Sequence, residues 1–374
     1  MSVEIKDKLK LRPSVAVVAH RDITEFFLSN IRKSISLKVN PLISNLLFEL
    51  DGTLVLEKWF GKNSIDGDDQ KDFLKLLSFL NENHILLSVD EPYSENHKIY
   101  PRVFTLLEDY FPAQSDVNKA FAKLHDAKVL IIGLGAVGTW VAECLLMSGV
   151  NHLVLVDADN VELSNLHRQS GFRERDLGRN KAQTLSERLM EMDAKANILC
   201  IEDWLDSSFF QRHSFEKLDL IINCADYPTV DETSRIIGEY GMKHGIPHII
   251  GGGYNLHQSL IGQVVLPGQT ACMECFRMNL DDLNEIDTSN ITKLEKRDRK
   301  IGSFPPLSAL SASITGNEAF KVLAGLKNLV MDDHRTEFLL RDLNFTNVKM
   351  DRRVDCKWCG YEGKYYQLQR DKNK

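Results

Sequence analysis

The stretch KVLIIGLGAVG, residues 128–138, decides the fold of this chain. It runs from a continuous apolar strand into Gly133, Gly135 and Gly138, and a helix-forming segment follows over residues 137–147. Glycines directly after a buried strand permit a tight turn, and they let backbone N–H groups at the helix N-terminus approach phosphate oxygens. The stretch therefore predicts the strand, turn and helix that open a nucleotide-binding βαβ unit.

The alternation of strands and helices continues downstream. A second strand, HLVLVD, ends at Asp157, 19 residues after Gly138, where a carboxylate can accept bonds from ribose hydroxyls. A helical stretch over residues 181–192, a strand over 197–202 and the apolar strand LDLIINCAD, residues 218–226, follow. We therefore expect an α/β fold with a Rossmann-like, doubly wound, mainly parallel sheet covered on both faces. A glycine turn that binds no ligand is the plain alternative, and the strand, helix and acid in their expected places argue against it.

Polar and cationic residues past the second strand favour ATP over NAD. Residues 157–181 contain the stretches DAD, LSNLHRQ and GRNK, and Asp226 ends the last strand. A nicotinamide ring needs an apolar slot and little extra charge. Substitution at the α-phosphorus of a triphosphate instead needs Arg and Lys to neutralise developing charge, and a carboxylate to hold Mg²⁺. Each residue alone can be explained as a cap, a surface charge or a turn residue, and their combination favours a triphosphate site.

Four motifs in order, GLGAVG, VDADNVELSNLHRQ, LGRNKAQ and NCAD, are followed by two Cys-x-x-Cys pairs. Together they resemble the ThiF/MoeB family of ATP-dependent adenylating enzymes, relatives of the ubiquitin-activating enzymes, over about residues 98–374. The resemblance implies the ThiF/MoeB adenylation fold, ATP and Mg²⁺. It also implies the nucleotide-binding residues: Gly133, Gly135 and Gly138 at the phosphates, Asp157 at the ribose with Asp159 beside it, Asn165, Arg168 and Lys181 at the triphosphate, Gln169 in support, and Asp226 at the magnesium. Of these, Arg168, Lys181 and Asp226 are expected to be catalytic.

A further catalytic candidate is Arg102, in the sequence Tyr100-Pro101-Arg102. The family often carries an arginine here that reaches into the ATP site of a second subunit, so the resemblance implies a homodimer with shared sites. An arginine at a domain boundary is otherwise a solvated charge or part of a structural ion pair.

Two Cys-x-x-Cys pairs, Cys272 with Cys275 and Cys356 with Cys359, predict a structural zinc site. Four thiolates from two short turns place soft ligands tetrahedrally around Zn²⁺ and leave no open position for water. A thioredoxin-like redox pair is the alternative, and the presence of two pairs argues against it. The other cysteines lie in apolar segments and are expected to be small core residues: Cys144, Cys200 and Cys224.

Two departures from the family pattern bear on the chemistry. No cysteine lies between Cys275 and Cys356, so the thioester step of ubiquitin-type activators is not expected. The Asp-Asn pair that is usual at the magnesium strand is here Asp226-Tyr227, which leaves the role of its second member open.

Residues 1–97 are expected to form a small α+β domain ahead of the adenylation domain of residues 98–374, because the polar stretch 90–98 separates them. A charged segment predicts an exposed, mobile crossover loop over residues 279–306. The extra domain, the sequence GSFPPL at residues 302–307 and the small-residue helix LSALSASITGNEAFKVL resemble the peptide-modifying branch of the family, represented by the microcin C adenylating enzyme and the pantocin A maturation enzyme. That branch uses its N-terminal domain to clamp a ribosomally made precursor peptide, for which β-strand addition is the physical rationale. A dimerisation or scaffolding domain is the alternative.

The resemblance thus implies ATP-dependent adenylation of a carboxylate or amide oxygen of a precursor peptide, in the biosynthesis of a peptide-derived antibiotic. C-terminal adenylation of a ubiquitin-like sulfur-carrier protein is the main alternative. A tRNA-modifying relative, a non-catalytic docking protein and an NAD oxidoreductase are less well matched to the motifs.

The composition agrees with a globular enzyme. The chain has 374 residues with 43% hydrophobic and 26% charged residues, and its formal net charge is −7. A negative net charge gives no general attraction for nucleic acid or anionic lipid, so no nucleic-acid partner beyond the nucleotide and no membrane are expected. The N-terminus lacks the apolar core of a secretory signal, and we therefore expect a cytoplasmic protein.

Overall fold

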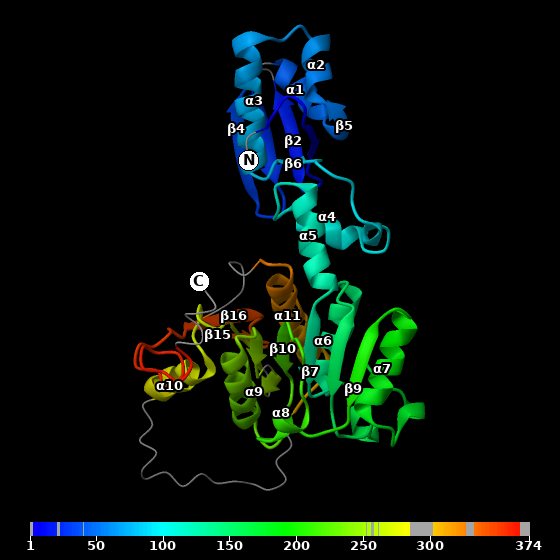
Figure 1. Cartoon of the computed structure of the whole chain (residues 1–374), viewed down its shortest axis with the longest axis vertical. Coiled ribbons are helices and arrows are strands. Elements are labelled where there is room, and N and C mark those ends of the chain that lie inside the picture. The colour runs from blue at the N-terminus through cyan, green and yellow to red at the C-terminus, as the bar shows by residue number, and fades with distance from the viewer. Residues whose placement is uncertain are drawn as a thin grey trace. The chain divides into compact units, whose positions relative to one another are not determined.

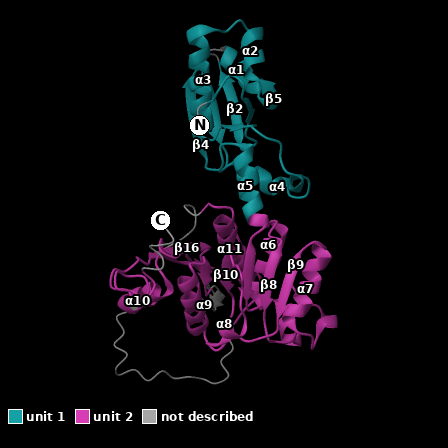
Figure 2. Ribbon diagram, viewed as in Figure 1, with its two compact units in different colours: residues 1–123 teal, residues 124–374 magenta. Residues whose placement is uncertain are grey.

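The computed structural model divides into two compact units, residues 1–123 and 124–374, which are described separately (Figure 2). The sequence boundary at residue 97 stays an interpretation of where the first domain ends. The structure describes the following ranges: residues 3–20, 23–39, 41–251, 253–255, 258–260, 262–284, 302–326 and 333–366.

The first unit is an α+β structure with two small antiparallel sheets, of strand order β5-β1-β6 and β2-β3-β4 (Figure 1). Apolar side chains from both sheets and from the helices form one core that includes Leu9, Phe26 and Trp59. The strands are β1 (Lys8–Leu11), β2 (Val15–His20), β3 (Ile23–Leu28), β4 (Lys33–Lys38), β5 (Asp51–Val55) and β6 (Leu86–Ser88). The helices are α1 (Pro41–Glu49), α2 (Leu56–Lys62), α3 (Gly67–Glu82), the 3-10 helix η1 (Glu95–Lys98), α4 (Pro101–Glu108) and α5 (Gln114–His125).

A buried polar network ties α4 to strand β1 within this unit. Arg12 is 1% exposed, and its guanidinium donates to the carbonyl oxygens of Leu86 at 3.0 Å and Phe111 at 2.8 Å. Lys10 Nζ lies 2.7 Å from Glu108 Oε1, which also accepts from the hydroxyl of Tyr93. Burial lowers the pKa of Arg12 to about 10. These contacts explain why residues 98–123 cluster with the N-terminal sheets.

The second unit is built on a six-stranded sheet of order β14-β11-β10-β7-β8-β9, in which only the edge strand β14 is antiparallel among these described strands. The inner strands β7, β8 and β10 are buried almost throughout, as expected for strands covered on both faces. This confirms the predicted doubly wound, mainly parallel sheet. The strands are β7 (Lys128–Ile132), β8 (His152–Val156), β9 (Asn197–Ile201), β10 (Leu220–Asn223), β11 (His248–Ile250) and β14 (Gln263–Val265).

Helices of the second unit connect successive strands of the sheet (Figure 1). From β7 the chain steps through β8 to β9, and from β10 it steps the other way to β11. Right-handed crossovers therefore place α6 and α7 on one face of the sheet and α9 on the other, and the strand order reverses between β7 and β10. The helices are α6 (Ala136–Met147), η2 (Leu163–Asn165), η3 (Glu174–Asp176), α7 (Lys181–Met192), α8 (Phe209–Arg212), α9 (Val230–His244), α10 (Met273–Asn284) and α11 (Pro305–Leu323).

A second sheet completes this unit, with the order β12-β13-β15-β16 and antiparallel pairing throughout. Helix α11 packs along α6. Among the helices that the structure describes, none combines the length and hydropathy that a bilayer crossing requires. The strands are β12 (Gly253–Asn255), β13 (Gln258–Leu260), β15 (His334–Leu339) and β16 (Asn344–Lys349).

The predicted crossover of residues 279–306 needs correction at both ends. Residues 279–284 continue helix α10, and α11 already begins at Pro305, two residues ahead of the predicted helix. Proline suits the first turn of a helix, because the N–H that it lacks has no partner there. Residues 285–301 lie outside the described residues.

His248 in β11 is a neutral histidine in the core of the second unit. It is 0% exposed, and its Nδ1 donates to the carbonyl oxygen of Ile246 at 2.8 Å. Gly241 of α9 lies against the ring, since a Cβ there would approach Nδ1 to 2.3 Å. Burial lowers the pKa of His248 to about 4.

The stability of the second unit should therefore fall as the pH falls from about 6.5 to 4. In that window the unfolded chain binds a proton that the folded chain does not, and the loss should approach about 3 kcal/mol. Urea unfolding followed by tryptophan fluorescence at a series of pH values measures it. His248→Asn keeps an N–H donor but cannot titrate, so it should flatten the pH dependence; an equal slope in both proteins would contradict the assignment.

Candidate functional site

The glycine turn after β7 has no room for side chains at two of its glycines. Gly133 has a φ of +87°, and a Cβ there would lie 2.5 Å from the backbone nitrogen of Ala225 in the loop after β10. A Cβ on Gly138 would lie 1.9 Å from the carbonyl oxygen of Gly133. Gly135, the N-cap of α6, faces open space, because a Cβ there would meet nothing within 4 Å. The turn therefore leaves the N-terminus of α6 open to a phosphate.

Asp157, directly after β8, fixes this turn from the other side. Its Oδ2 accepts the N–H of Leu134 at 2.6 Å, and its Oδ1 accepts the N–H of Asp159 at 2.8 Å. Burial raises the pKa of Asp157, and the positive charge of Lys181 opposes the shift. The carboxylate thus joins the ends of β7 and β8 and lies beside a cation.

Lys181 begins α7 next to the end of β8. It is 6% exposed, and its Nζ lies 2.7 Å from Asp159 Oδ2. Asn180 caps the helix by accepting the N–H of Gln183 at 3.1 Å, and its amide donates to the carbonyl oxygen of Asp157 at 3.1 Å. A largely buried ammonium is therefore held within the site by both its backbone and its side chain.

Asn165, Arg168 and Gln169 lie on one turn that begins at η2. Asn165 is 6% exposed, and its side-chain oxygen accepts the N–H of Glu162 at 2.9 Å. Arg168 is partly buried, and its guanidinium donates to the carbonyl oxygen of Ser164 in its own turn. Gln169 is 4% exposed, and its Oε1 has no hydrogen-bond partner among the described residues. The turn thus carries one partly exposed cation and one buried acceptor.

Asp226 lies in the loop after β10, one residue beyond the backbone that contacts Gly133, and it is exposed. The loop is held by Asn223, a residue to which the sequence reasoning assigned no role although it stands in the NCAD motif. Asn223 is 1% exposed, donates to Thr233 Oγ1 at 3.0 Å, and accepts the N–H of Ala225 at 3.1 Å. A polar residue at the end of an apolar strand is the signal that could have found it.

The structure brings most of the predicted nucleotide-binding residues to the ends of β7, β8 and β10. The glycine turn, Asp157, Asp159 and Lys181 are joined by direct contacts, and Asp226 lies in the loop that touches the turn. Arg102 is exposed near the start of α4 and belongs to the first unit. The roles of these residues stay predictions.

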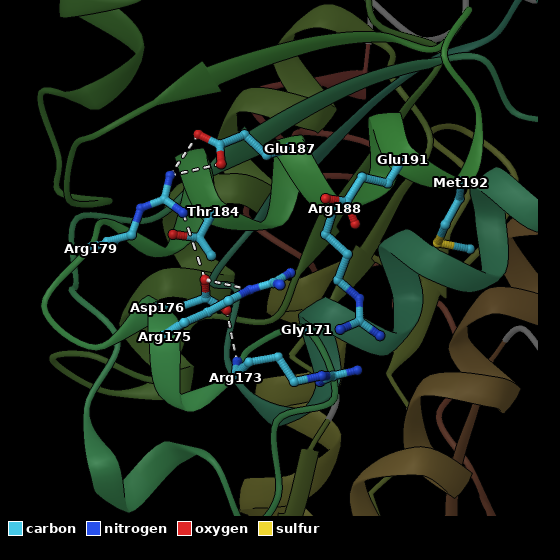
Figure 3. Close-up of a pocket in the computed structure, with 10 residues that line it drawn as sticks. All are labelled: Gly171, Arg173, Arg175, Asp176, Arg179, Thr184, Glu187, Arg188, Glu191 and Met192. Atoms are coloured by element: carbon cyan, nitrogen blue, oxygen red, sulfur yellow. Dashed lines mark hydrogen bonds and ion pairs between the residues drawn. The ribbon is translucent and has the colours of Figure 1, made fainter.

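A cavity of about 620 Å³ lies between residues 171–179 and helix α7 (Figure 3). Its lining includes Arg179, which donates to both carboxylate oxygens of Glu187 at 2.7 Å, and Arg188, whose Nε lies 3.2 Å from Glu143. Arg179 is also bound through its backbone, since its carbonyl oxygen accepts the N–H of Val161 at 2.8 Å. The Arg179–Glu187 pair fastens the connection before α7 to that helix, and the Arg188–Glu143 pair joins α7 to α6.

The four paired cysteines meet in one buried cluster. The sulfur atoms of Cys272, Cys275, Cys356 and Cys359 all lie within 4.8 Å of one another. Three of the separations are 3.8, 3.6 and 3.3 Å, far longer than the ~2 Å of a disulfide bond. Thiolates at about 2.3 Å from a tetrahedral Zn²⁺ are about 3.8 Å apart, so the donor set and its spacing fit that ion.

The chain around the second cysteine pair is tightly packed. The N–H groups of Arg353 and Trp358 each lie 3.4 Å from a cysteine sulfur, where they can stabilise thiolate charge. Lys364 and Tyr365 donate to Glu239 of α9 at 2.7 and 2.9 Å. The cluster and these bonds together fasten residues 356–366 to the sheet domain.

The remaining cysteines were predicted to be core residues, and the structure shows them only partly buried: Cys144, Cys200 and Cys224. Cys200 lies in the edge strand β9, and Cys224 follows the last residue of β10. Cys224 lies nearest to the glycine turn, with its Cβ 3.3 Å from the position that a Gly138 Cβ would take. Burial raises the pKa of its thiol to about 12, so this cysteine is a poor nucleophile at neutral pH.

The ThiF family model matches residues 113–358, which is more than half of the chain. The chain belongs to the ThiF family. As a ThiF-family protein it has the adenylation fold that the motifs predicted. The glycine turn, Asp157 and three of the four paired cysteines lie inside the matched range, and Cys359 lies one residue beyond it.

Curated relatives match parts of this ThiF-family chain. It is 30% identical to the SUMO-activating enzyme subunit 2 of Dictyostelium discoideum over 162 residues, which are 42% of this chain and 23% of that protein. It is 33% identical to the sulfur carrier protein ThiS adenylyltransferase of Bacillus subtilis over 159 residues, 41% of this chain and 44% of that protein. The same enzyme of Escherichia coli is 27% identical over 205 residues, 55% of this chain and 75% of that protein. The chain thus spans less than half the length of the first two relatives.

Solved structures match nearly the whole chain. Escherichia coli MccB with ATP is similar at a TM-score of 0.73 and 22% identity, covering 94% of this chain and 99% of that one. The microcin C7 biosynthetic enzyme MccB in complex with N-formylated MccA gives a TM-score of 0.72 at 20% identity, with 94% and 99% coverage. PaaA gives 0.68 at 19% identity, with 91% and 100% coverage. At these identities the likeness establishes the fold, and it includes the N-terminal unit.

The four-cysteine cluster predicts about one equivalent of zinc per chain, lost with any one ligand. Cys356→Ser should bring the bound zinc, measured by elemental analysis, close to zero and lower the melting temperature. Cys200→Ser is the matched control, because Cys200 lies in β9 outside the cluster and a serine can also donate to the carbonyl oxygen of Ala182. Equal zinc in the wild type and Cys356→Ser would contradict a metal role for the cluster.

Proposed function

We propose that this protein uses ATP to adenylate a carboxylate or amide oxygen of a ribosomally made precursor peptide, as a step in the biosynthesis of a peptide-derived antibiotic. The observation that carries the proposal is the match to MccB over 94% of this chain at nearly full length of that protein. The match includes the N-terminal unit, which a nucleotide-binding sheet by itself does not need. The ThiF family and its adenylyltransferase members support the use of ATP.

The residues at the sheet edge suit substitution at an α-phosphorus. In the proposed complex the glycine turn and the N-terminus of α6 bind phosphate oxygens, and Asp157 accepts bonds from the ribose. Lys181 already lies beside that carboxylate, and Arg168 is partly exposed and can turn from its own loop toward the triphosphate. An oxygen of the peptide attacks the α-phosphorus, the bond to the bridging oxygen breaks, and pyrophosphate leaves with the electron pair. The two cations neutralise the charge that develops.

Magnesium fits Asp226 by the chemistry of its donor. Mg²⁺ is commonly bound by one or two carboxylates together with substrate phosphates and water, and Asp226 offers one exposed carboxylate beside the glycine turn. When bound, the ion would reduce the negative charge of the phosphates. The zinc that fits the four-cysteine cluster would be structural, because the four thiolates complete its coordination.

No enzyme thiol is needed after adenylation in this proposal. The cysteine nearest to the glycine turn has a raised pKa, and the segment between the two cysteine pairs contains none. A neighbouring nitrogen or carbon of the same peptide can react instead, since a well-oriented intramolecular nucleophile lowers a barrier by about 7 kcal/mol or more.

The first unit offers an exposed strand edge to an extended peptide. In the sheet β2-β3-β4, the strands β2 and β4 each lack a second neighbour among the described strands. Main-chain bonds along such an edge bind a peptide with little dependence on its side chains, so one end of the peptide stays free to react. We include in the proposal a homodimer in which Arg102 reaches the partner's nucleotide.

Activation of a ubiquitin-like sulfur-carrier protein is the second candidate. It is favoured by the identity to the ThiS adenylyltransferases. The two functions differ in the molecule that accepts the adenylyl group. Mass spectrometry after incubation with ATP separates a modified short peptide from a carrier protein adenylated at its C-terminus.

Lys181→Ala and Asp226→Ala should each slow pyrophosphate release in the presence of the substrate peptide by roughly 100-fold or more, the usual effect of removing one group that stabilises transition-state charge. Lys217→Ala is a matched control, because Lys217 is an exposed lysine paired with Asp219 at the opposite end of β10. Rates equal to the wild type in Lys181→Ala and Asp226→Ala would reject the proposed nucleotide site.

Removal of residues 1–123, at the boundary between the units, should abolish peptide binding. It should retain ATP binding by residues 124–374, weakened only by the loss of the proposed Arg102 contact. The deletion removes both Lys10 and Glu108, so no buried carboxylate loses its ion-pair partner. Isothermal titration with ATP and with peptide measures both. Undiminished peptide affinity would reject the peptide-clamp role of the first unit.

A further inference from the structure

Two aromatic residues outside the proposed nucleotide-binding set meet above the carboxyl edge of the sheet. Trp204 follows β9 and Tyr227 follows β10, and their ring centroids are 5.2 Å apart with 56° between the planes. Both rings are well exposed, Trp204 at 46% and Tyr227 at 66%. Two exposed rings in contact offer a broad flat surface on which another planar group can stack.

The sheet order shows what lies beneath this aromatic pair. Strands β7 and β8 lie between β9 and β10, and adjacent strands are about 4.8 Å apart, so the ends of β9 and β10 are separated by roughly 14 Å. Rings at 5.2 Å therefore bridge across the ends of β7 and β8. Those ends carry the glycine turn and Asp157.

Both loops that carry the rings are anchored below them. The carboxylate of Asp203 accepts the N–H of Trp204 at 2.8 Å and is paired with Arg212 at 2.8 Å. On the other side, the backbone of Ala225 lies against Gly133, two residues before Tyr227. The bases of the two loops are thus fixed, and the aromatic side chains project from them.

We propose that Trp204 and Tyr227 hold the planar base of the nucleotide, with the phosphates at the glycine turn below. The inference rests on the proposed function, because it needs a nucleotide at this edge. An aromatic ring pair offers a base a stacking surface that hydrogen-bonding side chains do not. Tyr227, which stands where the family usually has asparagine, thereby acquires a role as a positioning residue.

The test compares a ligand that has a base with one that has none. Trp204→Ala should raise the dissociation constant of ATP about 5- to 140-fold, which corresponds to a base-stacking contribution of about 1–3 kcal/mol. The dissociation constant of inorganic tripolyphosphate should change less than twofold, because it has no base to lose. Tyr227→Leu keeps the bulk of the side chain and removes the ring, so it should weaken the binding of ATP and leave that of tripolyphosphate nearly unchanged.

Trp204→Phe provides a second readout. It keeps a stacking ring, so the affinity for ATP should stay within about threefold, while the change in tryptophan emission on ATP binding should disappear with the indole. Tyr361→Ala is the matched control, since Tyr361 is 69% exposed and paired with Tyr366 at 5.4 Å, next to the cysteine cluster. It should leave both dissociation constants and the emission change unaltered.

The outcomes distinguish the proposed base contact from the proposed adenylation function. If the wild type binds ATP and the Trp204 and Tyr227 variants bind it equally well, or if they weaken ATP and tripolyphosphate alike, the base contact is wrong and the adenylation proposal stands. If the wild type binds neither ligand, both fail. Selective loss of ATP binding, with the emission change confined to chains that retain Trp204, supports the base contact.

Discussion

Direct backbone contact between the glycine turn after β7 and the loop after β10 is the constraint on which the site depends. A side chain at Gly133 would overlap Ala225 and push the β10 loop away from the turn. Asp157 holds the turn from the other side through the N–H of Leu134. The ends of three strands are therefore locked together before any ligand arrives, so a bound phosphate meets donors that need little rearrangement.

Local sequence patterns were sufficient to predict much of the structure of the second unit. The periodicity of residues 181–192 predicted a helix with the limits that α7 has, because Asn180 caps it and apolar residues recur on one side. The repeated Cys-x-x-Cys spacing predicted a cluster that the structure assembles from segments 84 residues apart. In both cases the signal lies within a few neighbouring residues, where propensity and chelating geometry act directly.

Contacts between distant residues could not be predicted in the same way. The bond of Lys10 to Glu108 joins residues that are 98 positions apart, and neither position is distinctive in the sequence. The meeting of Trp204 and Tyr227 follows only from the order of the strands, which puts β7 and β8 between them. The start of α11 at Pro305 was missed because prolines read as part of a loop, although the first helical turn accepts them.

The cysteine cluster also determines the order of events during synthesis. Cys272 and Cys356 are 84 positions apart. At a translation rate of about 5–20 residues per second, the second cysteine pair is synthesised roughly 4–17 s after the first. In that interval two thiols that end up buried are exposed to oxidants and to foreign metal ions in the cell. The compact interior around Met273 and Met350 includes all four cysteines, so it cannot be complete until the second pair has been translated.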